Sequence, residues 1–578
     1  MKPHLWIDKL IFNNDYTLEL EKNSINIFVG PNNAGKSAVL RDVSNFLIDR
    51  GDRKQVIVKD ISINIPFDEA FLTDYMEQFA NADGVHYATI GANIYKTSIR
   101  HYLNKGTKSL GDLKQFFVQE LFTSNRLTGI TPPDNVNRLK QAPQHAIHII
   151  QRKDSIETQF NNYFKKAFGK EVIVNRGAGS KVPLHIGVAP AYDAINDRVS
   201  EKYLDELSKL DLLHEQGDGM KSFASVFLNL YAKDMSINVI DEPEAFLHPP
   251  QAKLLGQMIA KELDTNKQFF IATHSEHFLK GLLDYGGERL NIIRIQREEN
   301  ANTFSLLKND EIKNIWNDSL LRHSNILDGL FHSEVVVCES DSDCRFYSAI
   351  LTAISEATDE TVPDILFVQC GGKHRFPIVI NALQKLNVPL KVVGDFDLFH
   401  DENPIRNMYE GFGGTWTDIE KNFRTVKNAI DHKKPELEKK ALKENIDSIF
   451  EKISENAISD TDVKRIKEVL KKASPWSEAK LNGKSFIPSG PATKAYNEIN
   501  AELESKGIFI LDVGEIEAFD KNFALHGPKW VNKVLEKDLL NSADLQTARD
   551  FVKNKIMHSP VNLAAKYSGA WSNNRPKR

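Results

Sequence analysis

The sequence predicts an α/β protein with two large domains, each built around a sheet of parallel strands. Short apolar runs such as residues 25–29, 237–240 and 335–338 indicate buried strands, and each ends at glycine or at acidic residues. At 578 residues the chain exceeds the usual size of one domain. We therefore expect a first domain at 1–320 and a second at 331–578, with a helical linker between them.

Two stretches interrupt the alternation of strands and helices. Residues from about 66 to 168 have a polar, helical pattern without a recognisable motif, which indicates a helical insertion that serves oligomerisation or partner binding. Residues from about 403 to 488 are rich in lysine and glutamate. Helices of mixed charge are usually solvated, so a helical insertion is favoured there over a DNA-binding face.

Composition limits the classes of protein that remain. Hydrophobic residues make up 41% of the chain and charged residues 26%, and no apolar run is long enough to cross a bilayer. The three cysteines form no C-x-x-C pair, so neither a disulfide framework nor a thiolate zinc site is indicated. The first residues lack a signal-peptide pattern, and we expect a cytoplasmic protein without a membrane partner. The net charge of -5 argues against coating nucleic acid through overall charge, but is compatible with a local basic patch.

A phosphate-binding loop follows the first buried strand. The pattern G-x-x-x-x-G-K-[ST] is matched in full by Gly30, Pro31, Asn32, Asn33, Ala34, Gly35, Lys36 and Ser37. The loop amides and the following helix N-terminus can donate to phosphates, Lys36 adds a positive charge, and the Ser37 hydroxyl can bind Mg²⁺. The loop therefore predicts ATP with Mg²⁺ as the cofactor.

Two later strands of the first domain end in groups that suit ATP hydrolysis. Asp241 and Glu242 follow an apolar strand, where Asp241 can orient the Mg²⁺ shell and Glu242 can polarise the attacking water. His274 follows the next apolar strand, which places a neutral donor or acceptor beside the γ-phosphate. Hydrolysis, in addition to binding, is therefore expected.

A Gly-Asp-Gly turn before a helix resembles the signature loop of ABC-type ATPases. It comprises Gly217, Asp218 and Gly219, and the loop it resembles caps the γ-phosphate of a facing subunit. Gln216 stands where that loop commonly has serine, so the hydroxyl contact is lost while the backbone cradle is retained. We expect an ABC-type head that forms a homodimer or a higher homo-oligomer through the ATPase half.

Three predicted strands of the second domain end in carboxylates. Because the carboxyl ends of parallel strands meet at one edge of a sheet, these side chains should converge. Hard oxygen ligands of this kind suit Mg²⁺ or Mn²⁺, although any single group would more simply be a solvated loop acid. The residues are Glu339 and Asp343, Asp395 and Asp397, and Glu515 and Glu517.

The second half resembles a Toprim domain, which is found in topoisomerases, primases and some nucleases. The resemblance rests on Glu339 with Asp343, on the Gly371-Gly372-Lys373 turn and on Asp395-Phe396-Asp397. An ABC head followed by Toprim is similar to the OLD (overcoming lysogenization defect) nucleases, whose relatives include effectors of Gabija and retron antiphage systems. The resemblance implies an ATP-regulated, divalent-metal-dependent DNA endonuclease.

The resemblance also implies roles for individual residues. Glu339 and Asp343 would bind one metal ion, Asp395 and Asp397 would join or bridge to a second, and Glu515 and Glu517 would complete it. Ser340 replaces the family's glycine without removing a ligand. A basic residue late in the domain would stabilise the transition state, and the candidates, which the sequence does not separate, are Lys553, Lys555 and Lys566.

A second hypothesis belongs to another class of protein. In it the chain is a DNA-repair or chromosome-handling ATPase clamp whose Toprim-like half binds DNA or a partner without cutting. A topoisomerase is disfavoured because no catalytic-tyrosine domain accompanies the second half. An unrestrained nuclease would damage its host, so a trigger or inhibitor of protein, RNA or RNA–DNA is a further expected partner.

Overall fold

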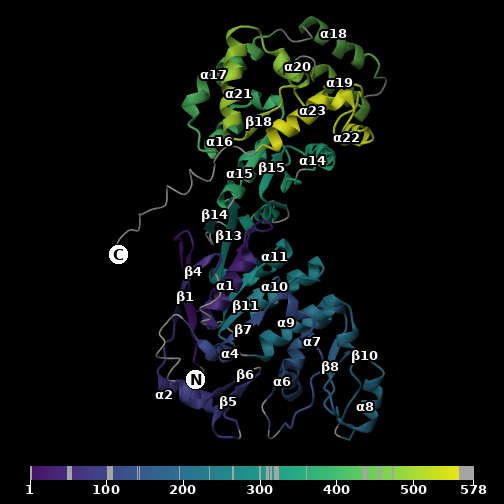
Figure 1. Cartoon of the computed structure of the whole chain (residues 1–578). Coiled ribbons are helices and arrows are strands. Elements are labelled where there is room, and N and C mark those ends of the chain that lie inside the picture. Colours follow the sequence, from purple (N-terminus) through teal and green to yellow (C-terminus); the bar gives the residue numbers. More distant parts are fainter. Residues whose placement is uncertain are drawn as a thin grey trace. The chain divides into compact units, whose positions relative to one another are not determined.

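The computed structural model divides the chain into two compact units, Met1–Ser319 and Leu320–Arg578 (Figure 1). The described residues are 3–48, 55–81, 83–90, 92–99, 109–138, 141, 143–193, 195–233, 235–262, 266–298, 301–307, 312, 315–317, 325–359, 361–433, 439–453, 457–471 and 474–558. No helix within these ranges is long and apolar enough to span a bilayer.

A six-stranded sheet forms the core of the first unit. Its strands follow the order β14-β13-β3-β12-β11-β7, and every neighbouring pair is parallel except β13 with β14. All residues of β3, β11 and β12 are buried, as expected for parallel strands that are covered on both faces. The strands are β3 (Ile25–Val29), β7 (Val118–Leu121), β11 (Ile237–Asp241), β12 (Gln268–Ala272), β13 (Leu290–Glu298) and β14 (Ala301–Leu307).

Antiparallel sheets and helices surround this core. The sheet β2-β1-β4 shares one hydrophobic core with α1 and the central strands. Helices α10 and α11 approach closely because Gly281 has no side chain: a Cβ there would lie 2.1 Å from the Lys253 carbonyl oxygen. The elements are β1 (Trp6–Phe12), β2 (Thr17–Glu19), β4 (Val58–Asn64), α1 (Lys36–Ile48), β8 (Glu171–Val174), β9 (Leu184–Gly187), α8 (Glu201–Ser208), β10 (Asp211–Leu212), α9 (Asp218–Ala232), α10 (Pro249–Glu262) and α11 (Glu276–Tyr285).

The segment 66–168 differs from the expected helical insertion. Besides helices it contains the hairpin β5-β6 and strand β7, which pairs with β11 at the edge of the core sheet. β7 has only four residues, and Gln119 and Glu120 interrupt its apolar pattern, so pairing with β11 decides its conformation. The elements are α2 (Glu69–Met76), β5 (His86–Thr89), β6 (Ala92–Tyr95), α4 (Lys114–Phe117), α5 (Thr123–Arg126), α6 (Ala146–Arg152) and α7 (Asp154–Phe168).

The second unit is built on a four-stranded sheet that is parallel throughout. Its order is β16-β15-β17-β18. Helix α14 packs against β16, and α15 contacts β15 and β17. The elements are β15 (Glu334–Cys338), α14 (Asp341–Glu356), β16 (Ile365–Gln369), α15 (Phe376–Lys385), β17 (Leu390–Gly394), α21 (Pro491–Ser505), β18 (Ile508–Ile510), α22 (Pro528–Val534) and α23 (Gln546–Phe551).

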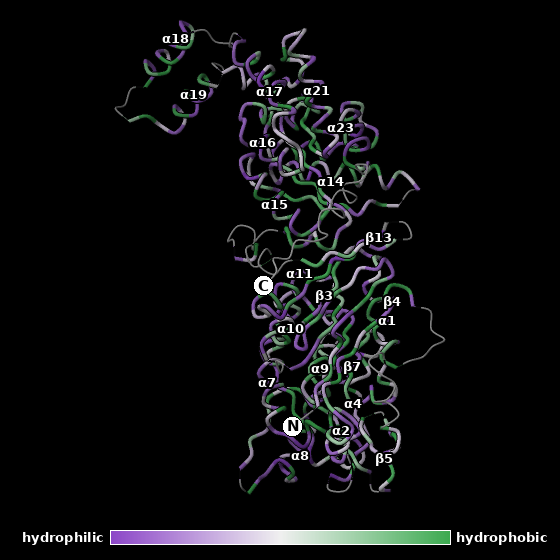
Figure 2. The backbone as a smooth tube through the Cα atoms, turned by 90° about the vertical axis from the view of Figure 1, so that its left-hand side faces the viewer, coloured by the Kyte–Doolittle hydropathy of each residue, from purple (hydrophilic) through white to green (hydrophobic). Residues whose placement is uncertain are grey.

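The stretch from about 403 to 488 is helical in its described part, but its helices have different surroundings. Figure 2 shows α18 and α19 as a pair apart from α17 and α21, and α18 has no buried residue. Helix α20, in contrast, packs against the turn Phe396–His400 that follows β17. The insertion is therefore solvated only in part. Its helices are α16 (Glu402–Gly411), α17 (Trp416–Asp431), α18 (Lys439–Phe450), α19 (Asp460–Lys471) and α20 (Pro475–Asn482).

Candidate functional site

The phosphate loop connects β3 to α1 and depends on two glycines with positive φ. Gly30 has φ of 146°, and a Cβ there would lie 2.1 Å from the Ile295 carbonyl oxygen. Gly35 has φ of 103°, and its Cβ would lie 2.2 Å from the Ile57 side chain. No other residue fits these positions without displacing a neighbour.

The Lys36 ammonium and the exposed tip of the loop are placed where they could contact a phosphate. The buried Lys36 Nζ donates to the carbonyl oxygens of Gly30 and Pro31, each at 2.7 Å. Asn32 and Asn33 are exposed at the tip, whereas Ala34 is buried beneath it. Incoming phosphate oxygens can replace the carbonyls as partners of the ammonium.

A hydroxyl–carboxylate pair connects the loop to the core sheet. The Ser37 Oγ donates to Asp241 Oδ1 at 2.9 Å, which joins the start of α1 to the end of β11. Burial, followed by the charge of Glu242, raises the pKa of Asp241. A hydroxyl beside a partly buried carboxylate is a donor set that fits Mg²⁺ bound to a nucleoside triphosphate.

Glu242 and His274 lie together at the carboxyl ends of β11 and β12. His274 Nε2 is 3.5 Å from Glu242 Oε1. Burial, and then the positive charge of Lys36, lowers the pKa of His274 to about 4, so the imidazole is neutral at physiological pH. Glu242 has the left-handed φ of 48°, which places its side chain beside the imidazole at a conformational cost.

Arg126 supports the strained turn and was not predicted from the sequence. It is buried on α5, donates to the Glu242 carbonyl oxygen at 2.5 Å and also donates to the Asp241 carbonyl oxygen. An arginine in a polar stretch without a motif carries no local signal of this role.

Glu244 joins the turns that follow β11 and β12. Its Oε1 accepts from Thr273 Oγ1 at 2.7 Å and from the His274 backbone N–H at 3.0 Å. Burial raises the pKa of Glu244 to about 7. Glu244 lies two positions after Glu242, in the segment 243–249 that resembles the subunit-contact segment of ABC ATPases.

The predicted signature loop begins α9 and is accessible. Gly217 and Asp218 are exposed, and Asp218 forms a 2.6 Å ion pair with Lys221 on its own helix. A Cβ at Gly219 would lie 2.8 Å from the Phe246 carbonyl oxygen, so the glycine permits α9 to approach the segment after β11. The loop therefore places the exposed start of α9 beside the segment that follows β11.

Glu339, Asp395 and Asp397 converge in the second unit. They follow the adjacent strands β15 and β17, and each offers a ligand atom such that all three atoms lie within 4.8 Å of one another. Burial raises the pKa of Glu339. Glu339 Oε2 and Asp397 Oδ1 are buried and accept no hydrogen bond from the described residues. Buried oxygens left without donors fit a divalent cation such as Mg²⁺ or Mn²⁺.

Asp343 lies outside this group of three. Its Oδ2 accepts from the Ser340 backbone N–H at 2.7 Å, and Ser340 Oγ accepts from the Asp343 N–H at 3.4 Å, which is a capping box at the start of α14. Burial raises the pKa of Asp343, and the charge of Glu517 adds to that effect. Ser340, which replaces the glycine of the family that the second half resembles, is therefore a helix cap.

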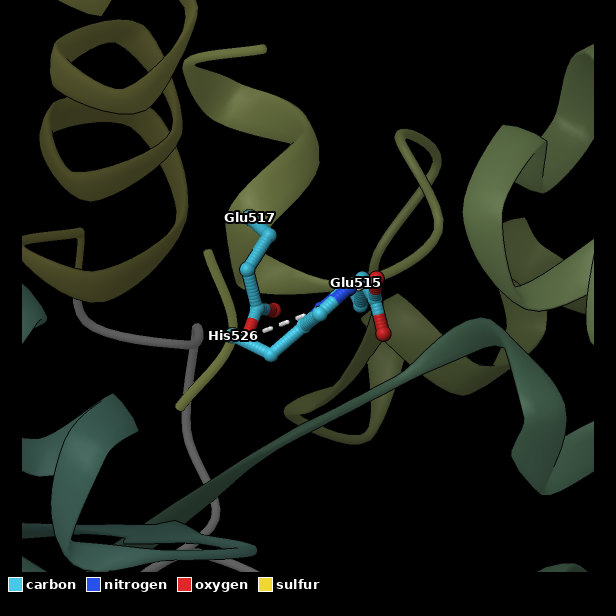
Figure 3. A group of neighbouring side chains, drawn as sticks. All are labelled: Glu515, Glu517 and His526. Carbon is cyan, nitrogen blue, oxygen red and sulfur yellow. Dashed lines mark ion pairs between the residues drawn. The ribbon is translucent and has the colours of Figure 1, made fainter. Parts of the chain in front are cut away.

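Glu515 and Glu517 form a second group with His526, shown in Figure 3. His526 Nδ1 is 3.8 Å from Glu515 Oε1 and 3.9 Å from Glu517 Oε1. Burial raises the pKa of Glu515, and the charges of Glu517 and Asp397 add to it. The six predicted acids therefore lie in one electrostatic neighbourhood but in separate clusters. His526 was not predicted, because it stands on a later loop without a motif.

Two lysines contribute positive charge to the first carboxylate group. Lys480 Nζ lies 2.7 Å from Asp395 Oδ2 and 3.8 Å from Asp397 Oδ1. Lys373, from the predicted Gly-Gly-Lys turn, lies 3.2 Å from Asp397 Oδ2. Although burial opposes the charge, the carboxylates raise the pKa of Lys480, which stays an ammonium. Lys480 belongs to α20, within the stretch expected to be a solvated insertion.

Two of the three late lysines, Lys553 and Lys555, lie on one turn near the end of the described residues. Lys555 forms a 2.6 Å ion pair with Glu504, which precedes β18, and the neighbouring Ile556 carbonyl accepts from Lys391 near the start of β17. This turn therefore lies at the amino edge of the sheet, opposite the acids. Lys553 is exposed on the same turn, and Lys566 lies outside the described residues. Lys555 therefore lies at the opposite edge of the sheet from the acidic cluster and does not complete it.

A family model matches part of the first unit. Residues 136–280 match the family model described as "AAA domain, putative AbiEii toxin, Type IV TA system", a range that includes Asp241, Glu242 and His274. No curated protein matches the chain.

Several solved structures are similar at low identity. One is an SMC head bound to the C-winged helix domain of ScpA, with 14% identity and a TM-score of 0.34 over 54% of this chain and 99% of that one. The SMC head domain from Thermotoga maritima has 11% identity and a TM-score of 0.28 over 53% of this chain and 100% of that one. An ATP-binding cassette of an ABC transporter in its ADP conformation has 13% identity and a TM-score of 0.26 over 56% and 98% of the respective chains.

The loop, the strand-end groups and the family match define the class of the first unit. It is a P-loop ATPase unit, in which Lys36 and the Ser37–Asp241 pair lie at the loop. The family match covers only part of the head and none of the second unit.

Replacing Glu242 should separate ATP binding from hydrolysis. Glu242→Gln keeps the loop and the Ser37–Asp241 pair but removes the carboxylate that polarises water, so kcat should fall by about 10²–10⁴-fold while ATP still binds. Lys36→Ala should lose binding itself. Equilibrium binding of a fluorescent ATP analogue and steady-state phosphate release measure the two effects. Unchanged turnover in Glu242→Gln would contradict the assignment.

Glu244 should make the stability of the head depend on pH. Its pKa is about 7 in the folded chain against an ordinary value of 4.5, so its stabilising contribution is complete below pH 4.5 and is lost as pH rises through 7. Glutamine cannot ionise, so Glu244→Gln should not lose this contribution. As the pH rises from 4.5 to 8, its free energy of unfolding should increase by about 3 kcal/mol relative to that of the wild type. Urea unfolding, followed by hydrogen exchange in β11 and β12, measures this. The prediction is wrong if the free energies of unfolding of wild type and Glu244→Gln change with pH in parallel. It is also wrong if Glu215→Gln, at an exposed site, has an equal effect.

Proposed function

We propose that the chain is an ATP-regulated, divalent-metal-dependent DNA endonuclease of the OLD type, with a Toprim nuclease domain as its second unit. One observation carries the proposal: Glu339, Asp395 and Asp397 gather at the carboxyl edge of a parallel sheet, and the buried Glu339 Oε2 and Asp397 Oδ1 accept no hydrogen bond from the described residues. The resemblance of the motifs to Toprim and OLD proteins supplies the substrate class.

The acidic residues and Lys480 would have different roles in phosphodiester cleavage. Bound divalent cations activate a water and stabilise the leaving oxygen in such reactions. Glu339, Asp395 and Asp397 would hold one ion, and Glu515 and Glu517 would hold another. Lys480 provides the positive charge that the resemblance assigned to a late lysine, since its ammonium lies 2.7 Å from Asp395 and can offset charge on a bound phosphate.

The first unit supports regulation by ATP through assembly. Gly217 and Asp218 are exposed at a helix N-terminus, where they can cap the γ-phosphate of a second copy. The active form is accordingly a homodimer or a higher homo-oligomer joined through the ATPase half. A nuclease of this kind is suited to bacterial antiphage defence, in the cytoplasm, under a separate trigger or inhibitor of protein, RNA or RNA–DNA.

The alternative is an ATPase clamp whose second unit binds DNA or a partner without cutting. Its support is the pairing of Lys480 with Asp395 and of Lys373 with Asp397 and Asp401, at 2.7, 3.2 and 2.9 Å. These ion pairs partly neutralise the carboxylates without any metal ion. DNA cleavage by the purified protein decides between the two functions.

Asp395→Asn should abolish cleavage while ATP hydrolysis survives, because it removes a charged ligand from the acidic cluster and leaves the head intact. Plasmid and single-stranded DNA, incubated with Mg²⁺ or Mn²⁺, report cleavage. Asp364→Asn is the matched control, since Asp364 precedes β16 at the amino edge of the same sheet. Wild-type protein that hydrolyses ATP but cuts no DNA with either ion would favour the clamp.

Lys480→Met should act on both metal binding and chemistry. Cleavage at saturating metal should fall by about 10²–10³-fold, as when other charge-stabilising donors are removed. Mg²⁺ should bind more tightly, because the ammonium no longer competes for Asp395. Calorimetric titration and cleavage rates measure the two effects. Lys484→Met, one turn later and 41% exposed, should change neither; equal rates in both variants would exclude a role for Lys480.

A further inference from the structure

The two metal-binding groups of the second unit differ in their donor atoms. Glu339, Asp395 and Asp397 offer oxygen alone, whereas Glu515 and Glu517 are joined by the imidazole of His526. Oxygen donors suit Mg²⁺ and Mn²⁺, and an imidazole nitrogen adds affinity for first-row transition metals. The resemblance had pointed only to the glutamates, so the histidine is an additional feature of this chain.

The distances fit a shared ion better than an ion pair. His526 Nδ1 lies 3.8 and 3.9 Å from the two glutamate oxygens, which is too long for hydrogen bonds. Two ligands of one cation, each at about 2.1 Å, can be at most about 4.2 Å apart, so both separations are within reach of one ion. The three side chains lie next to one another (Figure 3), and their ligand atoms are all within 4.8 Å of one another.

The backbone holds this group in place. The Gly527 N–H donates to Glu517 Oε1 at 2.6 Å, which fixes the carboxylate next to the histidine that precedes this glycine. Gly527 has φ of 57° and is followed by Pro528 at the start of α22, so the loop around His526 has little freedom. Glu515 is 8% exposed, whereas the His526 side chain is 73% exposed. Ions can therefore reach the group from solvent on the histidine side.

We propose that Glu515, Glu517 and His526 form a cation site that prefers a transition-metal dication such as Mn²⁺ over Mg²⁺. The site at Glu339, Asp395 and Asp397 discriminates less, because it lacks nitrogen. This inference rests on the proposed function only in that both require metal binding, and it does not depend on DNA cleavage.

Metal titration of the full-length protein tests the proposal. Protein stripped of metal is titrated with Mn²⁺, free Mn²⁺ is followed by electron paramagnetic resonance, and Mg²⁺ is then added as competitor. Wild type should retain one Mn²⁺ class that Mg²⁺ displaces poorly. His526→Ala should weaken that class at least about tenfold, the loss that follows removal of even an outer partner of a metal ligand.

Two further variants make the result specific. His526→Asp keeps a ligand but replaces nitrogen with oxygen, so Mn²⁺ should still bind while its advantage over Mg²⁺ falls. His432→Ala, at an exposed histidine where α17 ends, should behave as wild type. If His526→Ala and His526→Asp leave the Mn²⁺ preference unchanged, the histidine forms an ion pair only and the inference fails.

The failures of the two proposals are distinguishable. Wild-type protein that binds no divalent ion would remove both this site and the nuclease. Protein that shows the expected preference but cuts no DNA would remove the nuclease and leave the site. If DNA is cut but His526→Ala keeps the preference for Mn²⁺ over Mg²⁺, the proposed site would be removed and the nuclease would remain.

Discussion

Parallel strand pairing is the constraint on which both units depend. It sends the carboxyl ends of the parallel strands to one edge of the sheet, so groups from distant parts of the chain meet there. In the first unit that edge brings together the phosphate loop after β3, Asp241 after β11 and His274 after β12. In the second unit it gathers Glu339 and Asp395 from β15 and β17. The chemistry of each unit follows from this geometry.

Carboxylates that lie close together at a buried sheet edge repel one another, so nearby positive charge is needed to stabilise them. The two clusters differ in how close that positive charge lies. Around Asp395 the chain supplies its own cation, Lys480, and Lys373 does the same for Asp397. Around Glu515 the neighbouring acids raise the pKa beyond the effect of burial, while Lys480 and the exposed His526 oppose them from a longer distance. A bound divalent ion would relieve the repulsion that remains in either cluster.

The segments without motifs contribute more than their composition suggests. Arg126 comes from the polar stretch after β7 and supports the strained turn at Glu242 through two carbonyl contacts. Lys480 comes from the Lys- and Glu-rich insertion and reaches the acids because α20 packs on the turn after β17. Both residues look like ordinary surface charges in the sequence, and long-range packing gives them their roles.

The sequence by itself determined the phosphate loop, the order of the strand-end groups and the α/β character, because these depend on short patterns whose backbone requirements are local. Tertiary structure alone decided that Val118–Leu121 is a strand, that Lys555 lies at the amino edge, and that Lys480 and His526 join the acids. The physical reason is that a charged side chain on a helix or loop has no local partner. Its function depends on which sheet edge the fold brings it to, and no neighbouring residue encodes that.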